Sequence, residues 1–138
     1  MKDLIVLLMF ISLVDAKLIK NGSYVSDSFT NLQWQDNITQ SFTLSWEESI
    51  NYCTNLILND KDDWRLPNIN ELSSLVDESR LNPASSVIFE TMNGSLYWSS
   101  TTSSTINANA WSINFYDGLS YHYDKNHSQN IRCVRTAQ

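Results

Sequence analysis

The sequence has 138 residues, a length that suits one domain, and its nine lysines and arginines against fifteen aspartates and glutamates give a formal charge of −6. This acidic balance disfavours non-specific binding to nucleic acid or to anionic membranes. With so few cationic side chains any basic patch would be small, and we predict no nucleic-acid partner.

The first sixteen residues, MKDLIVLLMFISLVDA, have the build of a secretory signal. A lysine precedes the apolar run of residues 4–14, which is too short to cross a bilayer, and no other segment is apolar enough to anchor in a membrane. We therefore predict a signal over residues 1–16 and a secreted, periplasmic or cell-surface domain over residues 17–138. Removal of the signal takes away one lysine and two aspartates and leaves a charge of −5. The alternative for this segment is a buried strand or short helix.

The chain has two cysteines, Cys53 and Cys133. An even number of cysteines in an exported chain favours pairing. A bridge between them would close a loop of about 80 residues and, by the chain-entropy argument, would stabilise the fold by about 4 kcal/mol. The alternative is a pair of free, buried thiols.

The start of the domain predicts short antiparallel strands. Residues 20–23, KNGS, are a turn signal between two apolar dipeptides and predict an N-terminal hairpin. Residues 29–36, FTNLQWQD, predict a strand, a tight turn and a second short strand. Asn31 interrupts this stretch and tolerates a left-handed backbone.

A first helix begins after Ser45, because Glu48 three residues later completes a capping box. The apolar residues that follow recur at helical spacing: Trp46, Ile50, Cys53 and Ile57. This stripe places Cys53 on the buried face. The polar residues 59–63 end the helix.

A second helix begins inside the stretch DDWRLPNINEL. Pro67 disfavours helical backbone at the residue before it. Asn68 is then the N-cap, and Glu71 completes a second capping box. We expect this helix to end near residues 77–79.

The residues before Pro67 raise the question of a ligand-binding cluster or a structural joint. We assign Trp64 and Leu66 to the core. Arg65 has a planar head with five donors, which suits an internal ion pair or bonds to backbone carbonyls. An exposed Arg65 in a concave site would instead favour ligand binding.

Residues 80–110 predict mostly irregular structure. The low apolar content of residues 99–109 favours an exposed loop or an edge strand, with Tyr97 and Trp98 anchoring its start. Residues 130–135, NIRCVR, predict a closing strand.

Between these segments, residues 111–123 alternate apolar and polar side chains and predict a hairpin. A three-residue loop over residues 116–118, with its glycine left-handed, pairs Phe115 with Leu119 and gathers the apolar side chains on one face. The polar side chains then share the opposite face: Ser112, Asn114, Ser120 and His122.

The order of several motifs resembles one known family, the Lcl C-terminal-type domain, named after the end domain of a bacterial collagen-like adhesin. The matching pieces are TNLQWQD (30–36), SWEESINYC (45–53), DWRLPNINELSSLVD (63–77), YWSST (97–101), AWSINFYDG (110–118) and RCVR (132–135). The resemblance implies an α+β, C-type-lectin-like fold in which a helix cysteine pairs with one in the last strand, here Cys53 with Cys133. It also implies an extracellular or envelope binding module, which in the adhesin attaches to sulfated glycans.

No set of residues in the sequence predicts catalysis or a cofactor. The Glu-Pro-Asn and Gln-Pro-Asp tripeptides of calcium-dependent lectins are missing, and calcium needs six to eight oxygen ligands. His122 and His127, near Asp117 and Asp124, form the one metal-like grouping, but their spacing is a weak signal. We predict no metal and no formylglycine-generating activity, because both cysteines are committed to a bridge.

Ligand binding is best predicted where hydroxyl and amide groups lie near aromatic rings, since such surfaces suit sugar or peptide recognition. The candidate residues are Tyr97, Asn107, Asn109, Ser112, Asn114 and His122. For Tyr97 the alternative is a core position.

The sequence therefore predicts an α+β domain with two helices packed on small antiparallel sheets. We expect a non-enzymatic recognition module that binds a surface glycan or protein. The alternatives are an enzyme acting on envelope proteins or glycans and a structural subunit that forms a homo-oligomer.

Overall fold

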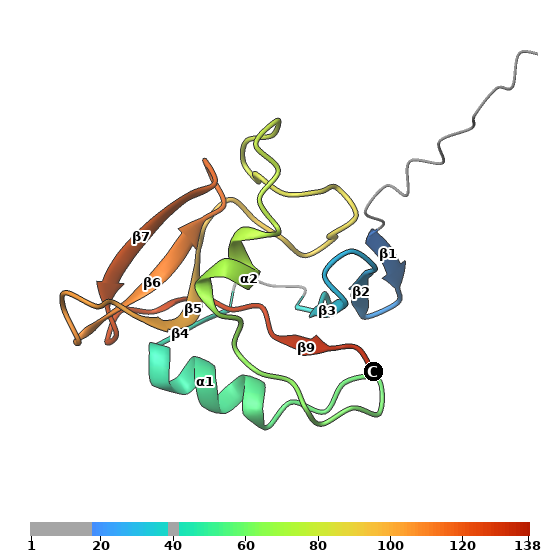
Figure 1. Ribbon diagram of the computed structural model, residues 1–138, viewed down its shortest axis with the longest axis horizontal. Coiled ribbons are helices and arrows are strands. Elements are labelled where there is room, and N and C mark those ends of the chain that lie inside the picture. Colours follow the sequence, from blue (N-terminus) through green and yellow to red (C-terminus); the bar gives the residue numbers. More distant parts are fainter. Residues whose placement is uncertain (1–17, 39–41) are drawn as a thin grey trace, which may run out of the picture.

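The computed structural model describes residues 18–38 and 42–138, so the predicted signal over residues 1–16 lies outside the described residues. The fold is α+β, as predicted, with two sheets and two helices (Figure 1). The strands are β1 (Leu18–Asn21), β2 (Tyr24–Asp27), β3 (Leu32–Gln35), β4 (Thr43–Leu44), β5 (Leu96–Thr102), β6 (Asn109–Asn114), β7 (Leu119–Asp124), β8 (Gln129–Asn130) and β9 (Val134–Thr136), and the helices are α1 (Trp46–Thr54) and α2 (Ile69–Ser73).

An antiparallel sheet of four strands has the order β1-β2-β3-β9. The predicted N-terminal hairpin is confirmed, with Gly22 at a φ of 65° in the turn between β1 and β2. Asn31 has a φ of 58°, the left-handed backbone that was predicted for it. Because β9 pairs with β3, the last strand of the chain lies beside its first strands (Figure 1).

The second sheet has five strands in the order β4-β8-β5-β6-β7. β5 pairs with β8 in parallel and with β6 in antiparallel orientation, so it is an interior strand. The prediction of an exposed loop or edge strand over residues 99–109 was therefore wrong for the part up to Thr102, and the exposed residues of this stretch are 104–108. Ser99 is fully buried because its hydroxyl donates to the carbonyl of Trp111 at 2.7 Å.

The hairpin of β6 and β7 has a different register from the predicted one. Asn114 pairs with Leu119, so the loop has four residues, and the predicted pairing of Phe115 with Leu119 was wrong. The backbone of Phe115 is already bonded outside the hairpin, since its N–H donates to Ser95 and its carbonyl accepts from Ala84. Gly118 is left-handed as predicted, with a φ of 81°.

Both predicted capping boxes are present. At α1, Glu48 N–H donates to the Ser45 hydroxyl and Ser45 N–H donates to the Glu48 carboxylate. At α2, the same reciprocal bonds join Asn68 and Glu71 at 2.8 and 2.9 Å. Neither helix of the described residues is long and apolar enough to cross a membrane.

Both helices are shorter than predicted. α1 ends at Thr54, and Ile57, which was predicted on its buried face, is 74% exposed. α2 ends at Ser73 instead of near residues 77–79. The chain leaves the helix there because the Asp77 N–H donates to the carbonyl of Ala84, in an isolated bridge between two irregular segments.

Arg65 forms the internal ion pair that the sequence predicted. Its two terminal nitrogens donate to the two carboxylate oxygens of Glu71 at 2.6 and 2.8 Å. Burial of the Glu71 carboxyl raises its pKa, but the bonds from Arg65 and from the Asn68 N–H lower the pKa by a larger amount. The net pKa of Glu71 is therefore below the usual value. The backbone of Arg65 exchanges two hydrogen bonds with Val134 of β9, which makes this stretch a structural joint.

The buried apolar side chains form two clusters. The larger contains Val25, Leu32, Trp34, Leu72, Leu75, Phe89, Met92, Tyr97, Ile113, Phe115 and Val134. The second surrounds the disulfide and contains Trp64 and Leu66, both buried as predicted. Cys53 of α1 is bonded to Cys133, which lies just before β9, so the predicted bridge is confirmed and the free-thiol alternative is wrong.

We expect replacement of both cysteines, Cys53→Ser with Cys133→Ser, to lower the free energy of unfolding by about 4 kcal/mol, because the bridge closes a long loop in the unfolded chain. Urea unfolding of the oxidised chain and the double variant measures this difference. Ser128→Ala, at an exposed loop position, is the control and should leave stability unchanged. Equal stability of the oxidised chain and the double variant would contradict the expectation.

Candidate functional site

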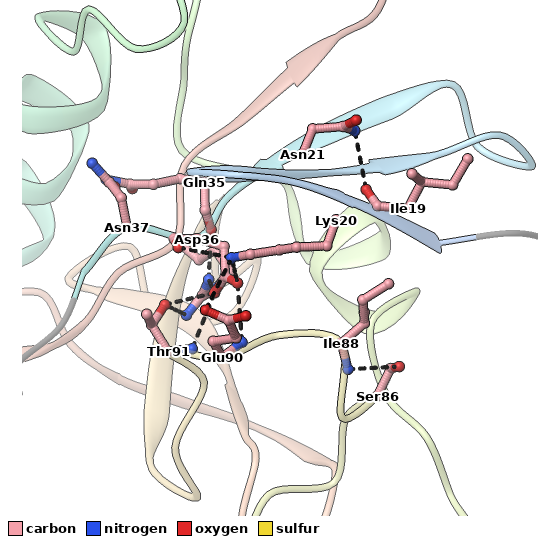
Figure 2. Close-up of polar contacts among 11 residues, drawn as sticks. Ile19, Lys20, Asn21, Gln35, Asp36, Asn37, Ser86, Ile88, Glu90 and Thr91 are labelled. Carbon is pink, nitrogen blue, oxygen red and sulfur yellow. Dashed lines mark hydrogen bonds and ion pairs between the residues drawn. The ribbon is translucent and has the colours of Figure 1, made fainter.

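The first candidate for a site is a cluster of buried charges around Asp36, which follows β3 (Figure 2). The side chain of Asp36 is 0% exposed and that of Arg132, its ion-pair partner at 2.8 Å, is 1% exposed. Lys20 reaches the same carboxylate from β1, and the N–H groups of Glu90 and Thr91 donate to it from the segment before β5. The cluster thus joins four separate segments of the chain.

This cluster has the composition of a catalytic centre but not its accessibility. Burial of the Asp36 carboxyl raises its pKa, yet the hydrogen bonds from Lys20 and Thr91 and the charge of Arg132 lower it by more, so the net pKa lies below the usual value of an aspartate. Five hydrogen bonds, two of which are the ion pairs with Lys20 and Arg132, already occupy its two oxygens. A fully buried, fully bonded carboxylate has no room for a ligand, and we interpret the cluster as structural.

The second candidate is an open hollow of about 460 Å³ at the end of the five-stranded sheet where β5 begins and β6 ends. Its volume falls within the range of roughly 300–1,000 Å³ that is usual for small-molecule sites. The lining residues come from four segments of the chain: Thr43, Gly94, Ser95, Leu96, Asn114, Tyr116, Ser128, Gln129 and Asn130. None of them carries a charged side chain.

The hollow collects hydrogen-bonding groups that the protein leaves free. Four lining hydroxyls have no partner among the described residues: those of Thr43, Ser95, Tyr116 and Ser128. Asn114 uses its Oδ1 to accept from the Tyr116 N–H at 2.9 Å, while its Nδ2 is unused within the described ranges. Asn130 donates its Nδ2 to the carbonyl of Leu96 and leaves its Oδ1 free.

Gln129 lies at the boundary between the hollow and the protein interior. It lines the hollow and is only 4% exposed. Its Oε1 accepts a hydrogen bond from the buried hydroxyl of Ser112, which fixes the orientation of the amide. Its Nε2 is buried and has no partner in the part of the chain that the structure describes. Four other buried side-chain atoms of the described residues also lack a partner, so what distinguishes this donor is that its residue lines the hollow.

Two of the six predicted ligand residues are buried in the structure, and one lines the hollow. Tyr97 is 2% exposed, and its ring packs edge-on against Phe115 at 5.3 Å between centroids. Ser112 is 0% exposed and acts through Gln129, which it orients. Asn114 lines the hollow directly.

The other three predicted residues lie near the opposite end of β6. Asn109 and His122 are joined by a hydrogen bond of 2.9 Å between Nδ2 and Nδ1. The His122 ring lies edge-on to Trp111 at 4.9 Å. Asn107 is exposed in the loop that precedes Asn109. The structure thus divides the six predicted residues into three near the start of β6, a buried pair and a single member of the hollow.

Most of the hollow was missed by reasoning from sequence. Tyr116 was assigned to the hairpin turn, Asn130 was assigned to the closing strand, and no role was predicted for Gln129. The chain contains a usable signal, since two amide residues follow Ser128 at the start of a predicted strand. The signal indicates a site only once β8 is known to pair with β5, because this pairing brings Gln129 and Asn130 next to Ser95 and Leu96.

The other candidates are a metal site and a second hollow. In residues 18–38 and 42–138, no three His, Cys, Asp or Glu side chains lie close enough to hold a metal ion, and the absence of a metal site stays a prediction. A second hollow of about 490 Å³ lies beside α1 and is more apolar. Its lining residues are Phe42, Leu44, Glu48, Asn51, Tyr52, Asn55, Leu56 and Ile57.

We expect Asp36→Asn to lower the free energy of unfolding by about 3–5 kcal/mol at neutral pH, because it leaves Arg132 buried without its counter-charge. Since the folded-state pKa of Asp36 is depressed, this stability is present above the unfolded-state pKa of about 3.9 and is lost as the pH falls through the lower folded-state value. The gap between wild type and variant in urea unfolding should therefore narrow below about pH 4.

Asp62→Asn is the matched control, because Asp62 is exposed and its side chain has no partner in the described part of the chain. Its effect should stay within about 0.5 kcal/mol. Equal losses in the two variants, or a gap that does not change with pH, would contradict the structural role of Asp36.

Comparison with protein-family models matches residues 23–135 to the family described as the Lcl C-terminal domain. The match covers most of the chain and includes both cysteines, both helices and all residues of the hollow. It confirms the resemblance that the motif order indicated. Comparison with curated proteins finds no match. The C-type-lectin-like fold implied by the resemblance stays a prediction.

Proposed function

We propose that this chain, which belongs to the Lcl C-terminal domain family, is a non-enzymatic recognition module that binds a glycan or protein on a surface through the polar hollow. One observation carries the proposal: unused hydroxyl and amide groups from four segments converge beside the exposed ring of Tyr116. Sites that bind small ligands combine an apolar surface with a few placed polar groups.

The chemistry of the lining supports binding over catalysis. Acid–base catalysis needs a group whose pKa lies near the working pH, and nucleophilic catalysis needs an activated nucleophile. The nine residues around the hollow include no carboxylate, imidazole, thiol or amine. An enzyme acting on envelope proteins or glycans is the alternative, and hydrolysis or modification of such a substrate by the purified chain would favour it.

The proposed location is secreted, periplasmic or cell-surface. The disulfide between Cys53 and Cys133 supports it, because disulfides persist in oxidising compartments and are rare where thiols are kept reduced. The signal-like residues 1–16 support it independently. Appearance of the processed chain outside the cytoplasm, starting near Lys17, is the direct check.

A second candidate function is self-association through β7. This strand is the outer edge of the five-stranded sheet, and it exposes Leu119 by 57% and Tyr121 by 37%. An uncovered edge strand offers unpaired N–H and carbonyl groups to another chain. Light scattering on the purified chain distinguishes self-association from a monomeric recognition module. A stable dimer that Tyr121→Lys dissociates would favour the homo-oligomer.

We expect the full chain, produced by export, to bind intact cells or arrayed surface glycans and proteins, and we expect Ser128→Trp to abolish this binding. Ser128 is exposed, so the indole would fill the hollow without disturbing the core. Binding to the array and to cells measures the effect, and thermal unfolding checks that the variant is folded.

Ser104→Trp is the matched control, because Ser104 is exposed in the loop between β5 and β6, near the predicted residues Asn107 and Asn109. Retained binding in this variant would support the hollow. Loss of binding in Ser104→Trp alone would indicate that the binding site is the loop between β5 and β6. No binding of the unaltered chain to any surface would overturn the recognition role.

A further inference from the structure

We infer that the ligand of the hollow is an uncharged, hydroxyl-rich sugar, an inference that rests on the proposed function and deepens it. The first argument is the balance of free groups. Each unused hydroxyl, such as those of Ser95 and Ser128, both donates and accepts a hydrogen bond, and the free Oδ1 of Asn130 accepts only. A sugar hydroxyl also does both, so it finds partners for its proton and for its lone pairs. A sulfate or carboxylate only accepts and would leave the acceptors of the hollow unpaired.

The second argument is charge. A sulfated or acidic ligand is best held by arginine or lysine, and the lining contains neither. Several cations of the described residues are already used in ion pairs within the fold: Lys20, Arg65, Arg132 and Arg135. The whole chain carries a formal charge of −6, which repels an anionic ligand at low salt.

The third argument is the place of Tyr116. Its side chain is 55% exposed while it lines the hollow, so the ring offers an apolar face at the rim. Its backbone is held on both sides, because the N–H donates to Asn114 and the carbonyl accepts from Asn82. An aromatic ring on a held backbone, beside hydroxyl and amide groups, suits a sugar, which has an apolar C–H face and a hydroxylated edge.

The fourth argument comes from Gln129. The hydroxyl of Ser112 holds its Oε1, and its buried Nε2 lacks an acceptor among the described residues. Because the Nε2 itself is buried, a ligand hydroxyl would supply that acceptor once the Gln129 amide turns toward the hollow that it lines. Gln129 and Asn114 then provide donors from the lining of the hollow, while the exposed Tyr116 contacts the sugar with its ring.

The test uses the full exported chain and two sets of probes. The neutral probes are oligosaccharides ending in glucose, galactose, mannose or N-acetylglucosamine, and the anionic probes are heparin and chondroitin sulfate oligosaccharides. We expect binding to at least one neutral probe, with less than about a twofold change in affinity between low and high salt, because no ion pair is formed. We expect the anionic probes to bind more weakly.

Three variants connect this binding to the hollow. Tyr116→Ala should weaken binding of the neutral probe about tenfold, and Tyr116→Phe, which keeps the ring, should change it by less than about threefold. Phe29→Ala is the control, because it also removes an exposed aromatic ring. Phe29 is 80% exposed and lies in the turn between β2 and β3, and it does not line the hollow. Its affinity should equal that of the unaltered chain.

The outcomes separate this inference from the proposed function. Salt-sensitive binding to sulfated probes, or binding to a surface protein but to no sugar, would overturn the neutral-sugar inference and leave the recognition role in place. Neutral-sugar binding that Tyr116→Ala does not weaken would overturn the hollow as the sugar site. Failure to bind any sugar or surface would overturn both the neutral-sugar inference and the proposed recognition role.

Discussion

The buried ion pair between Asp36 and Arg132 is the constraint on which the rest of the fold depends. Asp36 directly follows β3 of the four-stranded sheet, and Arg132 lies between β8 of the other sheet and β9. Two charges removed from water are tolerated only when each meets its partner and further hydrogen bonds. Both sheets must therefore be in place together, and the segment that carries Thr91 must close over the pair.

Structural features that depend on neighbouring residues could be predicted from the sequence. Features that depend on contacts between distant segments could not. The capping boxes at Ser45 and Asn68 depend on residues three positions apart, so they could be predicted. The register of β6 could not, because Ser112 and Ile113 are both buried and alternation gives no preferred face. The hollow joins Thr43 to segments that lie more than fifty residues further along the chain, and no local pattern reports such a meeting.

The protein keeps its charges and its unused polar groups in different places. Its ionic contacts hold strands and loops together, as Arg135 does with Asp63 and Arg65 with Glu71. The hollow has only neutral hydroxyl, amide, aromatic and aliphatic groups around it. A surface built this way gains its selectivity from the geometry of hydrogen bonds, which salt screens far less than it screens attraction between exposed charges.

The position of the disulfide determines which segments carry tension that is applied to the two ends of the chain. Every residue of the hollow except Thr43 lies between Cys53 and Cys133 in the sequence, inside the covalent loop. Tension applied between the two ends of the chain would pass through the sulfur–sulfur bond and would bypass that loop. Strands β1, β2 and β3 lie outside the loop, so they could separate under such tension while the segments from Gly94 to Asn130 stay unstretched.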